Sequence, residues 1–168
     1  MSERSTAPGG LALVEALVNT LDIESGTDTL DTPEGRHHLA ITEAGLAEAR
    51  ELREALRAAL LAHAGHPPHR TVTPLGSLLA RAPLYVAVDD HDGSARLTAA
   101  DTDPLLSRVA AAVAEALVAG TWTRLKACEA GTCHWAYYDR SPAGRGRWCS
   151  MQVCGARAKM RRYRAKGP

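Results

Sequence analysis

The 168-residue sequence predicts an α+β protein in two parts: a mostly helical N-terminal domain with a small β-hairpin, and a short C-terminal module. Charge divides the chain near Gly120. Residues 1–120 carry 9 Lys and Arg against 17 Asp and Glu, whereas residues 121–168 carry 11 against 2, a balance of −8 against +9. Six of the seven Trp and Tyr residues also follow Gly120, and a short module needs such side chains to form a core. We therefore expect a disordered tail at 1–9 and domains at 10–120 and 121–168.

The start of the N-terminal domain shows two short helical patterns. Apolar residues recur at helical spacing from Leu11 to Leu21, which predicts a helix over about 10–20. After a polar loop, Thr32 precedes a proline. This is the arrangement of an N-cap with proline at the first helical position, so a short helix is expected over about 33–40.

The strongest helical pattern covers about 43–64 and follows Thr42. Arg50, Glu54 and Arg57 are spaced at i,i+4 and i,i+3, which favours charge pairs on the outer face of this helix. A glycine and two prolines downstream end it. Its apolar stripe consists of Ala49, Leu52, Leu56 and Leu60.

The rest of the N-terminal domain predicts a hairpin between two helices. A proline begins a short helix over about 74–80. The apolar run at 84–90 and the weaker one at 94–100 have strand character, and the HDG between them supplies turn residues. Asp103 followed by proline caps a helix over about 104–119. The apolar stripe of this last helix consists of Leu106, Val109, Val113 and Leu117.

The chain shows no signal for export or for membrane insertion. Its N-terminus lacks an apolar segment behind a basic start, and no stretch approaches 18 apolar residues. We expect a soluble, cytoplasmic protein with no membrane partner. Heavy use of Ala, Arg and Gly indicates a GC-rich bacterial genome. In a reducing compartment, cysteines serve more often as metal ligands than as disulfides.

The four cysteines of the chain follow the pattern Cys-x4-Cys-x15-Cys-x4-Cys. Two short pairs separated by a strand and a turn can converge on one tetrahedral ion, and thiolate ligands favour Zn²⁺ over Mg²⁺ or Ca²⁺. A redox pair or a disulfide staple is the competing interpretation. Four cysteines leave no open coordination position, so zinc catalysis is not expected. The predicted structural zinc ligands are Cys128, Cys133, Cys149 and Cys154.

The remaining chemistry-bearing residues form no convincing active site. No Ser-His-Asp set, carboxylate pair or phosphate loop is present, so we do not expect an enzyme. His134 lies beside Cys133, and adjacent residues rarely both reach one ion, so it is interpreted as a bystander. His63, His66 and His69 cluster in a polar loop, where solvent exposure is a simpler explanation than a second metal site.

The C-terminal segment predicts a basic helix from Gly155 to Lys166. We expect Met160, Tyr163 and the aliphatic stem of Lys159 to pack back on the zinc core. A helix fixed to zinc at its N-terminus suits insertion into a DNA major groove. Its cations are Arg157, Lys159, Arg161, Arg162, Arg164 and Lys166. The preceding turn adds three cations expected to contact phosphates: Arg140, Arg145 and Arg147.

The C-terminal residues also resemble a known family. The run RLKACEAGTCHWAYYDRSPAGRGRWCSMQVCGARAKMRRYRAK, at 124–166, closely resembles the CGNR-type zinc finger of bacteria. That family has Cys-x4-Cys, an aromatic-Tyr-Asp-x-Ser stretch, Arg-Trp-Cys-Ser-Met, and Cys-Gly-Asn-Arg before a basic helix. The resemblance implies a treble-clef-like module of strands, turns and one basic helix. Ala156 replaces the Asn of the naming motif, so contacts made by that Asn do not transfer.

The N-terminal part is similar to the domain that usually precedes this finger, called ABATE and described as a putative stress-induced transcription regulator. The segment Leu-Val-Asn-Thr-Leu-Asp ending at Asp22 resembles its Asn-Thr segment, and the similarity covers most of 10–120. By this resemblance Asn19, Thr20 and Asp22 are candidates for a ligand or inter-domain contact. Helix C-capping by Asn19 or Thr20 is the simpler interpretation.

Together these patterns predict a zinc-dependent, DNA-binding transcriptional regulator. Its N-terminal domain would sense a small-molecule effector, mediate protein contacts or form a homodimer. Two alternatives remain: a redox or zinc switch in a protein-interaction module, and an RNA-binding accessory factor. Duplex DNA is favoured over RNA mainly by the family resemblance.

Overall fold

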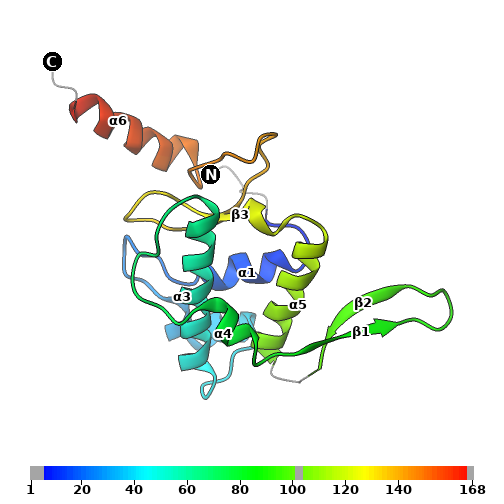
Figure 1. The fold of residues 1–168 in the computed structure, drawn as a ribbon. Coiled ribbons are helices and arrows are strands. Elements are labelled where there is room, and N and C mark those ends of the chain that lie inside the picture. Colours follow the sequence, from blue (N-terminus) through cyan, green and yellow to red (C-terminus); the bar gives the residue numbers. More distant parts are fainter. Residues whose placement is uncertain (1–5, 101–103, 166–168) are drawn as a thin grey trace.

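The computed structural model describes residues 6–100 and 104–165, and its secondary structure confirms the α+β class. Figure 1 shows α3 and α5 side by side, with α1 crossing between them and α6 extending away from the body. The helices among the described residues are α1 Leu11–Val18, α2 Pro33–His38, α3 Leu46–His63, α4 Leu75–Leu79, α5 Pro104–Val118 and α6 Ala156–Ala165.

Two separate antiparallel hairpins accompany these helices. Strands β1 (Leu84–Val88) and β2 (Ala95–Ala99) form an arm that projects from the helical body in Figure 1. Strands β3 (Leu125–Ala127) and β4 (Ala136–Tyr138) instead lie against α3 and α1. The two hairpins therefore have different surroundings, because β3 and β4 lie in the main core, whereas the β1–β2 arm contacts α5 and exposes most of β1 to solvent.

The main core lies where α1, α3 and α5 meet. Leu17, Leu56 and Val109 represent the three helices there, and each is fully buried. As predicted, the stripe of α3 from Ala49 to Leu60 is buried as well. Burial of such aliphatic side chains is the dominant stabilising term of a domain of this size.

Helix α3 begins later than the sequence pattern predicts. The first helical residue is Leu46, with Gly45 as its N-cap, whereas the predicted start was 43. The Thr42 side chain accepts a hydrogen bond from the Gly45 amide at 3.2 Å, which closes a turn before the helix. Thr42 therefore organises the preceding turn and does not cap the helix itself.

The predicted charge pairs on the outer face of α3 are wrong in their placement. Glu54 is 2% exposed and Arg57 is completely buried, although the two side chains do pair at 3.4 Å. Arg57 also donates to the Val18 carbonyl at 2.7 Å, and Arg50 pairs with Asp28 at 3.6 Å in place of Glu54. The segment after α1 covers this side of α3, which a periodicity within one helix cannot reveal.

The ends of two predicted elements also differ from expectation. Leu117, assigned to the apolar stripe of α5, is 58% exposed because the side of the last turn that meets the core carries Val113 and Ala116. Its predicted cap, Asp103, lies outside the described residues. Within the predicted tail at 1–9, Ala7 is buried, and its amide donates to Glu15 at 2.6 Å. No helix among the described residues is long and apolar enough to cross a membrane.

Candidate metal centre and basic helix

The four cysteine side chains converge on one point. Their sulfur atoms all lie within 4.8 Å of one another, and no disulfide joins them. Cys149 Sγ lies 3.7 Å from Cys133 Sγ and 3.8 Å from Cys154 Sγ. A tetrahedral ion with metal–sulfur bonds of about 2.3 Å requires sulfur–sulfur separations of about 3.8 Å. The cluster therefore has the size and ligand chemistry of a single four-coordinate metal site.

Local turns bring the first pair of cysteines together. Cys128 follows β3 directly, and its amide donates to the Trp135 carbonyl at 2.9 Å across the hairpin. The chain then reverses, and the Cys133 amide donates to the Ala130 carbonyl at 2.8 Å. These bonds fix both side chains on the same side of the hairpin end.

A single π-helical turn, Met151–Gly155, brings the second pair together. The Ser150 side chain accepts a hydrogen bond from the Val153 amide at 3.3 Å at the start of this turn. A Cβ on Gly155 would lie 3.1 Å from the Met151 sulfur and 3.3 Å from the Trp148 ring, so glycine allows close packing there. The turn leads directly into α6, which therefore starts at the metal site.

The packed thiols depend on one another for their protonation. Hydrogen bonds from the Cys133 and Cys149 thiols lower the pKa of Cys128 to about 2. The same proximity raises the pKa of Cys133 to about 12, and that of Cys149 rises as well. One thiolate therefore suppresses the ionisation of its neighbours, and a bound cation would reverse this effect by neutralising the shared negative charge.

The histidines do not join the metal cluster. His134 Nδ1 lies 3.0 Å from the Cys128 carbonyl oxygen, and the residue has a φ of +48°. His69 pairs with Glu54 at 3.2 Å, and its ring centre lies 5.6 Å from that of His134. Among the described residues, only the four cysteines form a group able to hold an ion.

A buried ion pair stabilises the loop between the two cysteine pairs. Lys126 Nζ lies 3.0 Å from Asp139 Oδ2, and both side chains are less than 10% exposed. Burial opposes the ionisation of Asp139, but hydrogen bonds from Ser141, Lys126 and Gly146 outweigh it and hold the pKa of Asp139 well below its usual value. A side chain at Gly146 would collide with this carboxylate, because a Cβ there would lie 2.9 Å away.

The first part of the cysteine module shares the core of the helical domain. Leu125, Ala127 and Ala136 are completely buried within the same cluster as the helices. The side chain of Asn19 donates to the Ala136 carbonyl at 3.0 Å and accepts from the Ala136 amide at 2.7 Å. His63 Nδ1 lies 2.8 Å from the Leu125 carbonyl oxygen. Strands β3 and β4 therefore bridge the two predicted domains.

Of the three N-terminal candidate residues, Asn19 is the one whose described side chain hydrogen-bonds to the cysteine module. Thr20 is buried, where its hydroxyl donates to the Leu17 carbonyl at 2.8 Å and accepts from Arg53. Asp22 accepts from the amides of Glu24 and Ser25 within its own loop. The Asn-Thr segment is thus a structural joint between the parts of the molecule.

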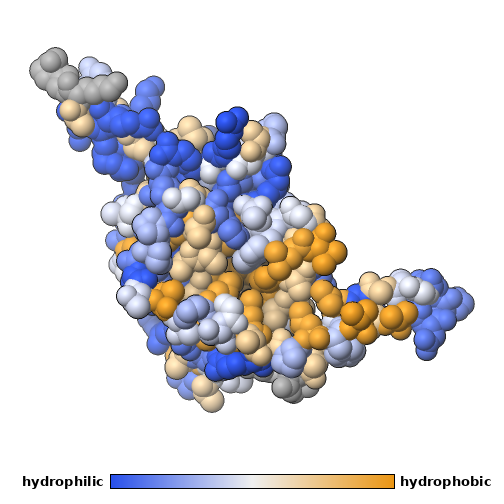
Figure 2. Space-filling model, in the orientation of Figure 1, coloured by the Kyte–Doolittle hydropathy of each residue, from blue (hydrophilic) through white to orange (hydrophobic). Residues whose placement is uncertain are grey.

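Helix α6 is almost entirely exposed, which corrects one part of the sequence interpretation. Met160 is 51% exposed and Tyr163 is 76% exposed, so neither packs back on the cysteine cluster, and Lys159 is exposed too. Ala158 is the buried side chain of the helix. The side chain of Ala156, at the first position of α6, also faces solvent. Figure 2 shows the projecting helix as a strongly hydrophilic surface.

The predicted nucleic-acid contacts divide into two groups. Three arginines have partners within the protein: Arg157 with Glu24 at 2.8 Å, Arg147 with Glu129, and Arg140 with the Thr6 carbonyl at 2.7 Å. The second group is exposed, and its side chains make no close hydrogen bond or ion pair with a described residue, although Arg162 is near enough to Glu129 to help lower the pKa of that carboxylate. This group consists of Arg145, Lys159, Arg161, Arg162 and Arg164. Lys166 lies outside the described part of the chain.

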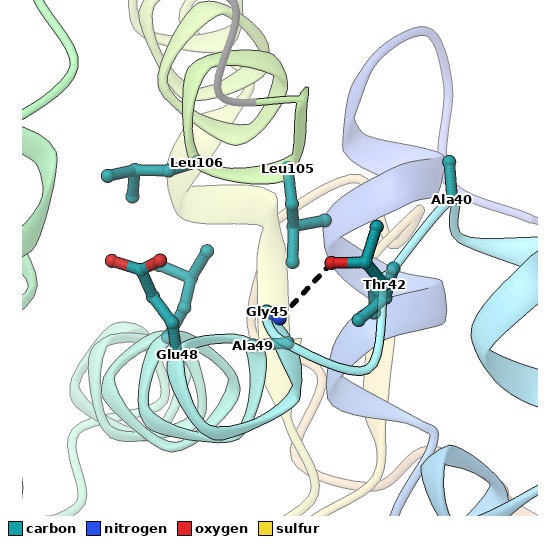
Figure 3. A pocket seen from close by; sticks show the side chains of 9 residues that line it. Ala40, Thr42, Gly45, Glu48, Ala49, Leu105 and Leu106 are labelled. Carbon is teal, nitrogen blue, oxygen red and sulfur yellow. Dashed lines mark hydrogen bonds between the residues drawn. The ribbon is translucent and has the colours of Figure 1, made fainter.

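A small pocket lies on the helical domain, away from the cysteines. It opens between the start of α3 and the start of α5, and Figure 3 shows Leu105 and Leu106 facing Ala49 and Thr42 across it. The Glu48 carboxylate lies at its edge and pairs with Arg81 at 2.8 Å. An apolar pocket with one carboxylate is chemically suited to a small apolar molecule.

Several residues important for this arrangement escaped the sequence reasoning. Lys126 and Asp139 form the buried pair, Glu24 holds Arg157, and Arg53 joins the buried charges beneath α3. The Tyr-Asp-x-Ser stretch contains a usable signal for Asp139, because Asp followed two residues later by Ser is typical of a side-chain-closed turn. No local pattern marks the other three.

The fold and the cysteine site define a class of protein: a helical domain joined to a small metal-binding finger that ends in a basic helix. Comparison with protein families places the chain more closely. Residues 11–120 match the ABATE family, "Putative stress-induced transcription regulator", and the chain belongs to that family. Residues 124–167 match the CGNR zinc finger. Neither is a family of enzymes, and no curated protein matches the chain.

Proposed function

We propose that this protein is a zinc-dependent transcription regulator that binds duplex DNA through α6. The observation that carries the proposal is the exposed basic helix, which starts at the π-helical turn containing Cys154. A ten-residue helix is about 15 Å long, and its width fits a major groove. Because its first turn is fixed to the cysteine cluster, the helix can enter the groove without losing much conformational freedom.

Zinc is the metal that the site fits best. Four thiolates at tetrahedral separation favour zinc among the common cellular cations, and they fill its coordination sphere. A filled sphere has no position for an activated water or a substrate. The site therefore acts as a structural centre, and catalysis is not part of the proposal.

The N-terminal domain supplies the regulatory half of the proposal. The pocket beside Glu48 would accept a small apolar effector, and the contacts of Asn19 and His63 would transmit a change in the helices to the finger. The ion pair between Glu24 and Arg157 provides a second connection, since it ties a loop of the N-terminal domain to the first turn of α6.

The salt dependence of binding tests the role of the free cations. Five exposed cations that contact phosphates should give a slope of log K against log[salt] of about −4.5. The double variant Arg161→Ala/Arg164→Ala should reduce the steepness by about 1.8, whereas Arg96→Ala, an exposed arginine on the β1–β2 arm, should leave it unchanged. Fluorescence anisotropy with a random duplex pool measures both slopes. A flat dependence for the zinc-loaded protein would refute the proposal.

One observation favours single-stranded RNA as an alternative partner. Tyr163 is 76% exposed and lines a surface hollow with Trp148, Lys159 and Arg162. Aromatic rings beside cations are suited to stacking on unpaired bases. Competition between duplex DNA and single-stranded RNA, repeated with Tyr163→Ala, separates the two. The alternative is favoured if RNA competes more strongly than duplex DNA and if Tyr163→Ala weakens RNA binding without weakening DNA binding.

A redox switch is favoured by a different observation. Cys133 and Cys149 are half-buried, whereas Cys128 and Cys154 are buried, so two of the four sulfurs can be reached from solvent. Oxidation of an accessible thiolate would release the metal. Mild peroxide treatment followed by a zinc-release assay tests this alternative. It gains support if oxidation changes the binding of a protein partner while DNA affinity is negligible throughout.

A further inference from the structure

The outer edge of the β1–β2 arm is uncovered and carries none of the residues that usually protect an edge strand. Strand β1 has the sequence LYVAV, with no charge, glycine or proline within it. Tyr85, Val86 and Val88 are 51%, 62% and 59% exposed. Proteins normally protect an exposed edge strand with charges or proline. This edge therefore has the properties of a surface that is covered in the working protein.

The hydrogen-bond pattern of the arm shows which backbone groups of β1 are free. The Asp89 amide donates to the Ser94 carbonyl at 2.8 Å, and the Ala100 amide donates to the Pro83 carbonyl at 2.9 Å. Bonded and non-bonded pairs alternate along an antiparallel ladder. The odd-numbered residues of β1 therefore bond to β2, and the N–H and C=O groups of the even-numbered residues point outward. These outward groups belong to Leu84, Val86 and Val88, and no bond from them to another described element is recorded.

These outward groups are complementary to themselves. If β1 pairs antiparallel with β1 of a second copy about a twofold axis at Val86, then Val86 lies opposite Val86 and Leu84 lies opposite Val88. Every outward N–H then meets an outward C=O of the other strand, which gives six hydrogen bonds by the alternation rule. Tyr85 lies opposite the small Ala87, and no charged residue faces a like charge.

Charge at the two ends of the arm supports the same arrangement. The turn at the tip contains Asp89, Asp90 and Asp92, all exposed, whereas Arg81 lies just before the base of β1 and is 52% exposed. In the self-paired register, the acidic tip of one copy runs alongside the base of the other. Arg81 of each copy, which also pairs with Glu48 of its own chain, then lies beside the acidic turn of the other copy, so the contact occurs once at each end of the paired strands.

The opposite edge of the arm explains why pairing would stop at two copies. Strand β2 carries Arg96, and α5 packs mainly against β2, with Val118 and Glu115 beside it in a shallow groove. Figure 2 shows the apolar surface of the arm continuing onto this end of α5. A twofold contact through β1 uses that edge in both copies, so it closes the assembly.

We propose that strand β1 is a homodimer interface, through which two copies of this chain form a four-stranded antiparallel sheet centred on Val86. The dimer would present two α6 helices from one assembly. The interface lies on the arm and does not depend on what α6 binds. A failure of the dimer proposal would therefore leave the proposed DNA binding untouched, and the two can be tested separately.

The mass of the zinc-loaded full chain in solution is the first test. Light scattering over a range of concentrations should show a dimer. Val86→Pro removes only an outward N–H, and should raise the dimer dissociation constant at least about tenfold. Ala95→Pro is the matched control, because it removes an outward N–H from exposed β2 and should leave the dimer intact. A monomer at every concentration, or a dimer that survives Val86→Pro unchanged, overturns the proposal.

Crosslinking provides a second test that does not depend on the folding of the proline variant. Opposed residues of a hydrogen-bonded pair have Cα atoms about 5.5 Å apart, within the range that a disulfide spans. Zinc-loaded Val86→Cys should therefore form a covalent dimer under mild oxidation, and Ala95→Cys should not. Equal crosslinking of the two variants, or none of Val86→Cys, would also overturn the proposal.

Discussion

The two halves of the cysteine module are held in place by different forces. The near half, β3 and β4, places Leu125, Ala127 and Ala136 in the core of the helical domain, where all three are completely buried. The far half comprises the cysteine-bearing turns and the chain after β4. It has a small cluster of its own, whose buried members are Cys128, Ala130 and Cys154. Its aromatic Trp148 is only partly buried. Hydrophobic burial therefore accounts for the first half, whereas metal coordination must account for the second.

The difference shows how a short basic segment can be presented without a core. Helix α6 buries little besides Ala158, and an isolated helix of this length is marginal in water. Leaving the helix exposed keeps its cations available. The metal site replaces the missing core, and the near half anchors that site to the rest of the protein. Three experiments would break or sharpen this comparison.

Metal removal should have the largest effect. Metal binding to small four-ligand modules is worth about 10–16 kcal/mol and supplies their folding energy. Chelation should therefore unfold the turn at about 129–134 and the segment from about Ser141 to α6, while β3, β4 and the helical domain stay folded. Hydrogen exchange by mass spectrometry should show lost protection in the far half and retained protection at Leu125–Ala127. Simultaneous loss in both halves would show that the metal holds the whole module.

A core truncation should have the next largest effect, and only in the near half. Leu125→Ala deletes a completely buried side chain and should lower the free energy of unfolding by about 2–5 kcal/mol. The matched change Val153→Ala, in a side chain that is 44% exposed, should stay within about 0.5 kcal/mol. Denaturant unfolding of the zinc-loaded proteins measures both. Similar losses for the two variants would contradict the division of forces.

Mild acid should have the smallest effect, and it should act at the joint between the halves of the molecule. Burial lowers the pKa of His63 below 6.5, so the unfolded chain takes up the proton at a higher pH than the folded protein. Stability from this group is therefore complete above pH 6.5 and is lost as the pH falls from there through the folded pKa. His69 shifts in the same direction and adds to the slope.

The variant His63→Asn isolates this contribution. Asparagine keeps a donor for the Leu125 carbonyl but does not titrate, so the fall in denaturant midpoint below pH 6.5 should become shallower. His69 should contribute to the slope that remains. An unchanged pH profile in the variant would show that the contact between His63 and Leu125 does not titrate with folding.

The sequence predicted those features that depend on neighbours along the chain. The proline after Thr32 correctly indicated an N-cap, because the Thr32 hydroxyl accepts a hydrogen bond from the Gly35 amide at 3.1 Å. The two apolar runs around HDG form the predicted hairpin. The start of α3 was missed because Thr42 closes a turn, and a threonine before a helical pattern has the same appearance in both roles.

Tertiary contacts decided the rest. Glu54 and Arg57 follow the spacing of surface ion pairs, but the segment after α1 and the loop after α3 cover them. Met160 and Tyr163 have the composition of core residues, but the π-helical turn aims α6 away from anything that could bury them. Spacing shows which side chains share a face, and only the folded chain shows what lies opposite that face.

The sequence by itself determined the cysteine spacing, the concentration of positive charge after Gly120 and the periods of the helices, because each depends on short-range chemistry. Only the tertiary structure decided that the four sulfurs lie within 4.8 Å of one another and that β3 and β4 complete the core of the helical domain. It also decided that β1 presents an open edge. These are relations between segments far apart in the chain, and the physical reason is that burial and coordination depend on distance in space.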